Sequence, residues 1–224
     1  MLDTIDNSDV RASISLKLSQ LGQEIGASLT EENLRVILTR AAELDNFVRI
    51  DIEDSTTTQR TVDTFKAVRQ DFKNVGMAIQ SYLRRSAQDI GDLNEIGAQV
   101  RLCKGAYQEG ADVAFTDKAE VDASYKRLAT ALLEDGTYPA FATHDPSMIA
   151  HVLGEATRLR RGRDDFEFQM LYGIRRDAQT QLVQEGYNMR VYVPFGSQWC
   201  PYFMRRIAER PANALFIMRA MLGS

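Results

Sequence analysis

Short apolar runs alternate along the chain with longer stretches in which apolar residues recur at helical spacing. The short runs predict strands, and the longer stretches predict helices that are apolar on one side. The predicted strands are Ser13–Leu18, Phe47–Ile52, Val75–Gln80, Gln99–Cys103, Ala140–Thr143, Phe166–Leu171 and Met189–Val193. The predicted helices are Thr30–Leu44, Thr57–Phe72, Ser81–Ile90, Asp117–Leu133, Pro146–Arg160 and Ala178–Glu185. Alternating strands and helices predict a parallel sheet with right-handed crossovers.

Two of the predicted helices carry start signals in the sequence. Thr30 with Asn33 resembles a helix start, and Pro146 directly follows Asp145, which is typical of a capped first turn. No linker rich in Pro or Ser divides the chain, so residues 1–224 are expected to form one domain.

Several predicted strands hold a polar residue among apolar ones, and this favours a barrel over an open sheet. Strands of an open sheet that is covered on both faces are more often plainly apolar. A (β/α) barrel instead builds its site at the carboxyl ends of the strands, with single groups from different strands. No Gly-x-Gly-x-x-Gly or phosphate loop is present, which disfavours a dinucleotide-binding sheet. The polar residues are Lys17, Asp51, Gln80, Arg101, Gln169 and Tyr192.

Composition indicates a globular protein of the reducing cytosol. Hydrophobic residues make up 44% and charged residues 26%, and the net charge of −4 comes from interspersed signs, which argues against nucleic-acid binding. The two cysteines lie far apart and the two histidines form no zinc pattern. No apolar run is long enough for a transmembrane helix, and the acidic start is unlike a signal peptide. The apolar stretch Ala214–Leu222 leaves peripheral membrane contact open.

An arginine pair near the C-terminus is the first candidate for chemistry. Arg205 and Arg206 follow Tyr202 and precede Glu209 at spacings that place all four on one face of a helix. Two guanidinium groups offer the paired planar donors that suit a small carboxylate. From this segment alone, a solvated surface pair remains the alternative.

A second candidate follows a predicted strand. Arg101 and Lys104 lie at its end, and Gly105 and Ala106 are small enough to let a flat ligand approach the backbone. A charge inside a barrel must be paired or must face a ligand. Arg101 therefore either faces a ligand or ties strands together through an ion pair with Asp51.

Two further strand ends carry polar residues that local structure could explain. Asp54 precedes the predicted helix at Thr57 and is typical of a helix cap. His144 lies in a predicted turn and is compatible with either a ligand contact or a capped turn.

Seven segments, taken in order, closely resemble the flavin-dependent proline dehydrogenase family. That family includes monofunctional bacterial enzymes and the first catalytic domain of the bifunctional proline-utilisation proteins. The resemblance extends over residues 13 to 217. It implies a distorted (βα)8 TIM barrel, with a final helix over the barrel mouth and a non-covalently bound FAD. The segments are Ser15–Ser19, Ile50–Glu53, Ile79–Tyr82, Arg101–Tyr107, Phe141–Asp145, Phe166–Gly173 and Tyr202–Glu209.

The resemblance also implies roles for single residues. Arg101 would approach the flavin N5 and Asp51 would hold it, which makes these two the catalytic pair. The implied substrate-binding residues are Lys17, Tyr192, Leu171, Tyr202, Arg205 and Arg206. The implied cofactor-binding residues are Ile52, Gln80, Arg101, Lys104, Gly105, Ala106, Thr143 and His144.

The implied reaction is oxidation of L-proline to 1-pyrroline-5-carboxylate by hydride transfer to FAD. It is the first step of proline catabolism to glutamate, and the electrons pass to a membrane quinone. The flavin supplies the difficult chemistry, while cations near the proline ring favour the neutral amine that releases hydride.

The sequence departs from the family at its start. Family barrels begin with a strand and helix before the lysine-bearing strand, whereas Lys17 lies sixteen residues from the start, so the first β/α unit is expected to be missing. Cys103 stands where an aliphatic residue is usual. Two alternatives stay open: a truncated, non-catalytic protein that binds FAD or proline, and a flavin dehydrogenase of another cyclic imino acid. Against hydroxyproline, the bulk of Tyr192 would disfavour an added ring hydroxyl.

Overall fold

The computed structural model describes residues 1–8 and 10–196, and these build one curled parallel sheet. The strand order in the sheet is the order in the chain, from β1 to β7, and every neighbouring pair is parallel. The strands are β1 (Ile14–Lys17), β2 (Val48–Asp51), β3 (Val75–Gln80), β4 (Gln99–Cys103), β5 (Ala140–Ala142), β6 (Glu167–Leu171) and β7 (Asn188–Tyr192).

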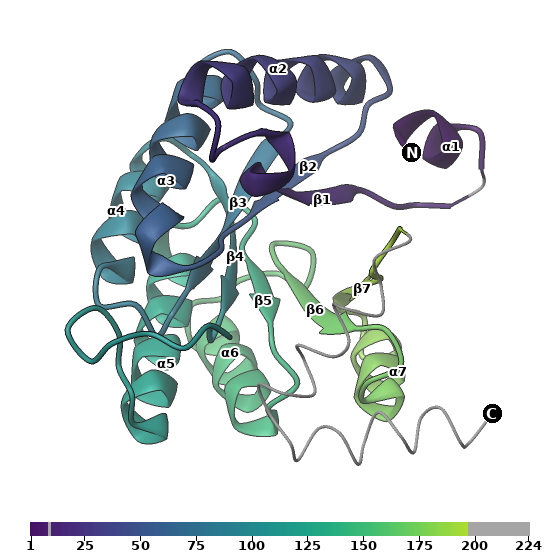
Figure 1. Ribbon diagram of the computed structural model, residues 1–224. Coiled ribbons are helices and arrows are strands. Elements are labelled where there is room, and N and C mark those ends of the chain that lie inside the picture. The colour runs from purple at the N-terminus through teal and green to yellow at the C-terminus, as the bar shows by residue number, and fades with distance from the viewer. Residues whose placement is uncertain (9, 197–224) are drawn as a thin grey trace.

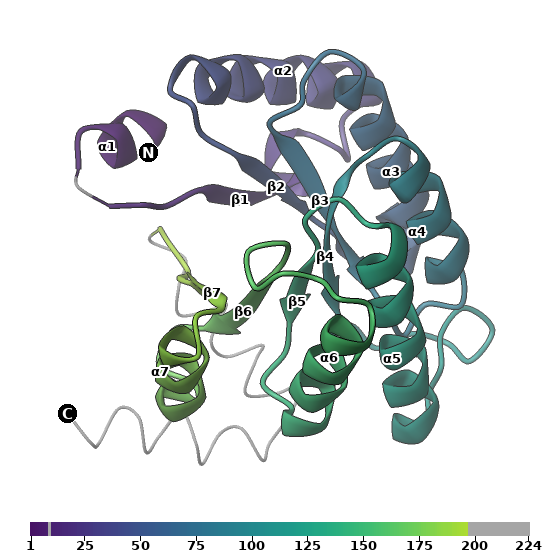
Figure 2. The same ribbon diagram turned by 180° about the vertical axis from the view of Figure 1, so that it is seen from behind.

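Helices cover the convex side of this sheet, so that it forms a half-barrel (Figure 1). Seen from behind, β1 and β7 are the two outer strands of the sheet formed by the described residues (Figure 2). The helices are α1 (Leu2–Asp6), the 3-10 helix η1 (Leu18–Leu21), α2 (Ala27–Glu43), α3 (Ser55–Arg69), α4 (Ser86–Glu95), α5 (Lys118–Asp135), α6 (Pro146–Arg158) and α7 (Arg176–Gln184). This is the distorted barrel class expected from the sequence, and the expected final helix over its mouth lies outside the described residues.

The strands have one apolar face and one polar face, because successive side chains of a strand point to opposite sides. The apolar residues share one core with buried residues of the helices, such as Leu34, Phe65 and Leu132. The polar residues point to the concave side. Fully buried residues of the apolar face include Ile50, Met77, Ile79, Leu102 and Phe168, each 0% exposed.

An aromatic cluster strengthens the core behind β5 and β6. The ring centroids of Phe141 and Phe166 lie 5.8 Å apart and those of Phe166 and Phe168 lie 5.7 Å apart, both in edge-on arrangements. Tyr187, just before β7, packs edge-on against Phe168 at 6.1 Å. Such pairs add to the stabilisation that burial gives.

Three aspartates are the N-cap residues of helices α3, α5 and α6. Asp54 accepts hydrogen bonds from the backbone N–H groups of Thr56 and Thr57, which confirms its interpretation as a cap. Asp145 accepts from Ser147 N–H in front of Pro146, which confirms the second start signal. Asp117 begins α5 in the same way. These caps satisfy donors that the first helical turn leaves open.

Two predicted helix starts were wrong. α2 begins at Ala27 after Gly26, and the Thr30 hydroxyl donates to the Gly26 carbonyl inside the first turn instead of capping. α4 begins at Ser86 and not at Ser81, because the backbone N–H groups of Ser81 and Tyr82 bind the carbonyls of Cys103 and Lys104. No helix of the described part is long and apolar enough to cross a membrane.

Candidate active site

A cavity of about 480 Å³ lies at the carboxyl ends of the strands. The last residue of every strand lines it, which is the arrangement expected when each strand of a barrel delivers one group to a common mouth. The lining residues are Lys17, Asp51, Ile52, Ala78, Gln80, Arg101, Cys103, Lys104, Gly105, Ala106, Tyr107, Ala142, His144, Gln169, Met170, Leu171 and Tyr192.

This cavity gathers the site residues expected from the sequence, with one exception in the described part. Thr143 does not line it: its side chain is buried, and its hydroxyl accepts a hydrogen bond of 3.1 Å from Asp145 N–H. Tyr202, Arg205 and Arg206 lie outside the described residues.

Arg101 is held through all three nitrogens of its guanidinium group. Nε donates to Gln169 Oε1 at 2.5 Å, Nη2 donates to Ser15 Oγ at 2.9 Å, and Nη1 forms an ion pair with Asp51. The register places Ala78 and Ala140 beside Arg101 on the neighbouring strands, which leaves room for its side chain. The Arg101 side chain is 9% exposed, so the cation is fixed at the wall of the cavity.

Asp51 joins this cation to Tyr192. The Tyr192 hydroxyl donates to Asp51 Oδ2 at 3.0 Å, and the Arg101 guanidinium lies 5.3 Å from the centre of the Tyr192 ring. The ion pair expected between Arg101 and Asp51 is therefore present, and it also fixes the aromatic ring at the end of β7. A cation over a ring is an attractive contact.

Below Arg101 the polar network continues down β6. Gln169 donates through Nε2 to Glu167, which accepts two hydrogen bonds of 2.9 Å from Arg190 on β7. Burial alone would raise the pKa of Glu167, but the hydrogen bond and charge of Arg190 bring it below the usual value. Glu167 is therefore an ionised carboxylate although it is only 2% exposed.

Arg49 forms the lowest polar layer of the concave face. It donates to the Gln99 carbonyl at 2.7 Å and its guanidinium lies 5.0 Å from the centre of the Phe47 ring. Burial, and then the charge of Arg101, lower the pKa of Arg49 to about 9, so it stays charged at neutral pH. Gly76 makes the space for it, because a Cβ there would lie 2.8 Å from Arg49 Nη1.

Two lysines reach the rim of the cavity. Lys17 donates to the Tyr107 hydroxyl at 3.1 Å and lies 3.8 Å from a Glu53 oxygen. Lys104 lies between two carboxylates, Asp145 at 2.8 Å and Asp122. Burial opposes ionisation of Asp145, but its hydrogen bond from Lys104 keeps its pKa below the usual value.

His144 is held as a neutral acceptor. Its Nε2 accepts a hydrogen bond of 2.9 Å from Leu171 N–H, which leaves the proton on Nδ1. Burial, followed by the charge of Arg175, lowers the pKa of His144. Both effects favour the neutral ring at pH 7.

Gln80 and Gly105 both line the cavity. Gln80 is 3% exposed, and its Oε1 finds no hydrogen-bond partner among the described residues. Gly105 has a φ of +111° and packs so closely on Tyr82 that a Cβ would overlap the ring. Packing thus explains the glycine, and its expected contact with a flat ligand stays a prediction.

The loop after β4 is tied to the start of α3. Glu109 accepts hydrogen bonds from Ser55 N–H at 2.7 Å and from Ser55 Oγ at 2.5 Å. The same loop carries Lys104, Gly105, Ala106 and Tyr107 into the cavity. The helix start therefore helps to fix this part of the wall.

Several residues of the cavity and its supporting network were not predicted from the sequence. Tyr107 lines the cavity, and Glu167 and Arg190 support it from below. Gln169, noted in the sequence only as a polar strand residue without a role of its own, also lines the cavity. The period of two along β6 was the available signal, because Glu167 and Gln169 alternate with buried Phe168. The ion pair between Arg190 and Glu167 could be predicted only once the pairing of β6 with β7 was known, because no nearby residue in the sequence indicates it.

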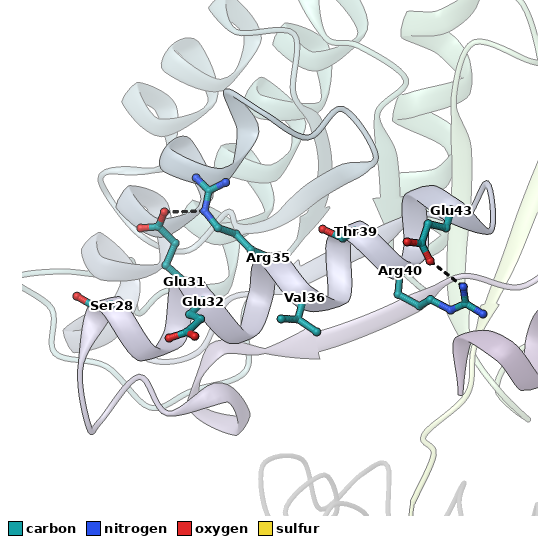
Figure 3. A pocket seen from close by; sticks show the side chains of 8 residues that line it. All are labelled: Ser28, Glu31, Glu32, Arg35, Val36, Thr39, Arg40 and Glu43. Carbon is teal, nitrogen blue, oxygen red and sulfur yellow. Dashed lines mark hydrogen bonds and ion pairs between the residues drawn. The ribbon is translucent and has the colours of Figure 1, made fainter.

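A larger depression, of about 740 Å³, runs along the outer surface of α2, away from the strand ends. Ion pairs Arg35–Glu31 and Arg40–Glu43 cross it, as Figure 3 shows. It is a solvated helix face, because its arginines are partly exposed and pair with carboxylates of α2 and with Asp71 and Asp3. Among residues 1–8 and 10–196, no group of three or more His, Cys, Asp or Glu is placed to hold a metal ion.

Comparison with known proteins agrees with this geometry. The family model described as proline dehydrogenase matches residues 2–219. The chain is 44% identical over 218 residues to proline dehydrogenase 2 of Bacillus subtilis (strain 168), covering 97% of this chain and 72% of that protein. It is 43% identical over 227 residues to proline dehydrogenase of Deinococcus radiodurans, covering 99% and 73%.

A solved structure extends the likeness to three dimensions. Proline utilization A (PutA) of Bdellovibrio bacteriovorus, inactivated by N-propargylglycine, matches with a TM-score of 0.82 at 28% identity, over 92% of this chain and 26% of that one. The chain thus spans about a quarter of the length of that protein. Family model, identity and fold all agree with the resemblance found in the sequence, and the chain belongs to the proline dehydrogenase family.

Proposed function

We propose that this chain oxidises L-proline to 1-pyrroline-5-carboxylate, the first step of proline catabolism to glutamate. Family membership and the cavity at the strand ends support the proposal. The observation that carries it is the fixed Arg101–Asp51–Tyr192 group at the cavity wall. It combines a permanent cation with an aromatic surface, as expected where charge develops beside a small ring.

We propose FAD as the cofactor, and the cavity fits a flavin on two observations. Gln80 Oε1 is a buried acceptor that lacks a partner among the described residues, which suits a ring N–H. The fixed Arg101 guanidinium lies at a wall that Ala78, Gly105 and Ala106 keep open. Gln80, Arg101, Lys104 and Ala106 would hold the cofactor, together with Ile52, Gly105 and His144, whereas Thr143 lies outside the cavity lining. When bound, the flavin accepts the hydride that leaves carbon 5 of proline.

The chain's own residues bind and orient the substrate in this proposal. Lys17 binds the proline carboxylate together with Arg205 and Arg206, which lie outside the described residues. Tyr192 and Leu171, with Tyr202, pack against the ring. The cations lower the pKa of the proline amine, because a nearby positive charge disfavours the ammonium form. Asp51 holds Arg101 in place and keeps the Tyr192 ring fixed.

We further propose that the electrons pass to a membrane quinone and that the protein works on the cytoplasmic side of the membrane. The family resemblance supports the acceptor. The apolar stretch Ala214–Leu222 would supply the peripheral contact that such an acceptor requires.

Flavin spectroscopy tests the proposal directly. Purified protein should show flavin absorbance, acid should release the flavin, and anaerobic L-proline should bleach it. Lys17→Met should raise the proline concentration needed for bleaching at least tenfold, because a charge-assisted contact is lost. Lys73→Met is the matched control, since Lys73 is exposed and donates only to the Arg69 carbonyl among the interactions described for it.

The outcomes separate the proposed function from its alternatives. Folded, colourless protein that takes up no added FAD would contradict the cofactor. Bound flavin that L-proline does not reduce would indicate a non-catalytic binding protein. Faster reduction by hydroxyproline than by L-proline would assign the site to another cyclic imino acid.

A further inference from the structure

We propose that Glu167, acting through Gln169, positions Arg101 at the cavity. Glu167 itself does not line the cavity, whereas Gln169 and Arg101 do. It is therefore a positioning residue in our assignment. The placement of Arg101 is independent of any cofactor, and only the consequence for the flavin rests on the proposed function.

The argument starts from the direction of two hydrogen bonds. The Arg101 guanidinium can only donate, and the ionised Glu167 carboxylate can only accept. Gln169 lies between them, with Oε1 accepting from Arg101 Nε at 2.5 Å and Nε2 donating to Glu167 Oε1. Only one orientation of the Gln169 amide satisfies both neighbours. The carboxylate of Glu167 thus requires the same orientation that Arg101 requires, and its hydrogen bond holds the amide in that orientation.

The charge of Glu167 is maintained from its other side. Arg190 donates to both carboxylate oxygens, and its charge helps to keep the pKa of Glu167 below the usual value. The carboxylate remains an acceptor across the neutral range as a result. If Glu167 were neutral and able to donate, Gln169 could turn its NH2 group toward Arg101 and face one donor with another.

Gln169 binds a nitrogen of Arg101 that the other two partners do not contact. Asp51 and Ser15 bind the two terminal nitrogens, and Gln169 binds Nε, nearest the stem. The solvent exchange of the Nε–H proton therefore reports whether the Gln169 amide oxygen still accepts from Arg101. The three contacts together fix the plane of the guanidinium, and the Nε contact is the one that depends on Gln169.

Exchange of the Arg101 Nε–H proton with solvent tests the proposal without any cofactor. In flavin-free protein, NMR should show this proton as protected, assigned by its loss in Arg101→Lys. Glu167→Gln should increase its exchange rate at least tenfold. Asp89→Asn is the matched control, because Asp89 is another buried carboxylate, 5% exposed, that binds one arginine, Arg85, through both oxygens. The control should leave Arg101 protected.

Paired variants separate positioning from simple charge pairing. Arg190→Gln removes the cation that keeps the buried Glu167 ionised, so Arg101 should lose part of its protection, as it does in Glu167→Gln. Glu167→Gln/Arg190→Gln removes both charges together and so limits the loss of stability. If Glu167 served only to neutralise Arg190, the double variant would regain the protection that Glu167→Gln loses. Continued fast exchange in the double variant is the expected result, and regained protection would overturn the proposal.

Gln169→Met tests the intermediate link and keeps the Glu167–Arg190 pair. It should increase the Arg101 exchange rate as Glu167→Gln does, and adding Glu167→Gln to it should change the rate less than twofold further. A large additional increase would mean that Glu167 acts by another route. These variants test the proposal even if Glu167→Gln alone does not fold.

In flavin-loaded protein, Glu167→Gln should shift the equilibrium of flavin reduction about tenfold toward the oxidised form, which is ~30 mV for two electrons. Gln169→Met should give a similar shift and Asp89→Asn none. If wild-type protein binds no flavin, the proposed function fails while the exchange experiment still decides the role of Glu167. If flavin binds and is reduced but exchange is unchanged in Glu167→Gln, only the inference fails.

Discussion

At the scale of single residues, the site depends on Arg101, whose guanidinium nitrogens all have hydrogen-bond or ion-pair partners. Arg101 has a partner at each of its three nitrogens, and Glu167 receives donors from Arg190 and Gln169. A planar guanidinium held in this way presents its charge in one orientation, without reorganisation when charge develops in the cavity. A lysine in its place would keep the charge and lose the orientation.

The Arg101–Asp51 pair gives the first prediction. Arg101→Met should lower the flavin reduction potential and slow reduction by proline. Asp51→Ala should give part of the same loss, and the double variant should lose less than the sum, because the two residues act through one contact. Stopped-flow reduction measured across pH checks this. Strictly additive losses together with a displaced pH profile in Asp51→Ala would show that Asp51 acts as an independent base.

His144 gives the second prediction, on pH. Its pKa is lowered in the folded protein, so the unfolded chain takes up this proton at a higher pH than the folded one. The free energy of unfolding should therefore fall as pH drops below the ordinary histidine value of 6.5. His144→Gln keeps an acceptor for Leu171 N–H but does not titrate, and should flatten this fall.

Urea unfolding between about pH 5 and pH 7 measures the effect of His144. The control is His151→Gln, which replaces the other histidine of the chain and should retain the fall that belongs to His144. An equal fall in wild type and His144→Gln would show that other groups cause it.

Residue roles that depend on a local pattern could be predicted, and those that depend on pairing across the sheet could not. Asp54 before α3 and Asp145 before Pro146 have their caps within three residues, so the sequence contains the whole signal. The contact between Glu167 and Arg190 joins two strands that a helix separates in the chain. Nothing near either residue indicates the other before the register is known.

At the scale of elements, strands were predicted better than helix starts. Each observed strand lies within one residue of its predicted bounds or inside them, because the short apolar runs that predicted the strands end where polar and turn residues begin. The start of α4 was wrong because Ser81 and Tyr82 continue to pair with the β4 end. That pairing is a tertiary contact, and it overrides a sequence that is compatible with a helix.

The cap of α3 gives the third prediction. Asp54→Ala should lower the free energy of unfolding by about 1 kcal/mol at pH 7, the usual cost of losing such a cap. Asp54→Asn is the matched control and should lose less, because an amide oxygen still accepts from the first turn. Chemical denaturation measures both changes.

The pKa of Asp54 also predicts how the stabilisation by this cap changes at low pH. A hydrogen bond from Thr56 is the largest cause that lowers it below 3.8, so the contribution is present above that pH and is lost as pH falls through the lower folded value. The difference between wild type and Asp54→Asn should therefore shrink under acid. A difference that stays constant down to unfolding would contradict the cap as its origin.

At the scale of the whole molecule, stability and chemistry belong to opposite faces of one sheet. Phe168 is fully buried against the helices, while Gln169, the next residue, points into the cavity. The apolar face removes large side chains from water, which is the main source of stability. The polar face gathers charges that must be paired, and it adds less to stability than the apolar face does.

This division gives the fourth prediction. Phe168→Ala should lower the free energy of unfolding by about 3–5 kcal/mol, the usual cost of emptying a large buried site. The fraction that remains folded should bind flavin with an unchanged spectrum. Gln169→Met should cost less, about 1–3 kcal/mol for the partners it leaves unsatisfied, and should alter the flavin spectrum.

Urea titration and flavin difference spectra, recorded on the same preparations, measure both variants. An altered spectrum in folded Phe168→Ala would show that the two faces are coupled through the strand. Unchanged spectra in Gln169→Met would remove that residue from the cavity network.

The alternation of faces also decides which changes of length the chain tolerates. Inserting or deleting one residue within β4 or β6 would turn Arg101 or Glu167 toward the helices and bring Leu102 or Phe168 into the cavity. Such a change would place an unpaired charge in the apolar core and would also remove the polar side chains of that strand from the cavity. Variation in length among related chains should therefore be confined to the loops, while strand positions vary by substitution, one face at a time.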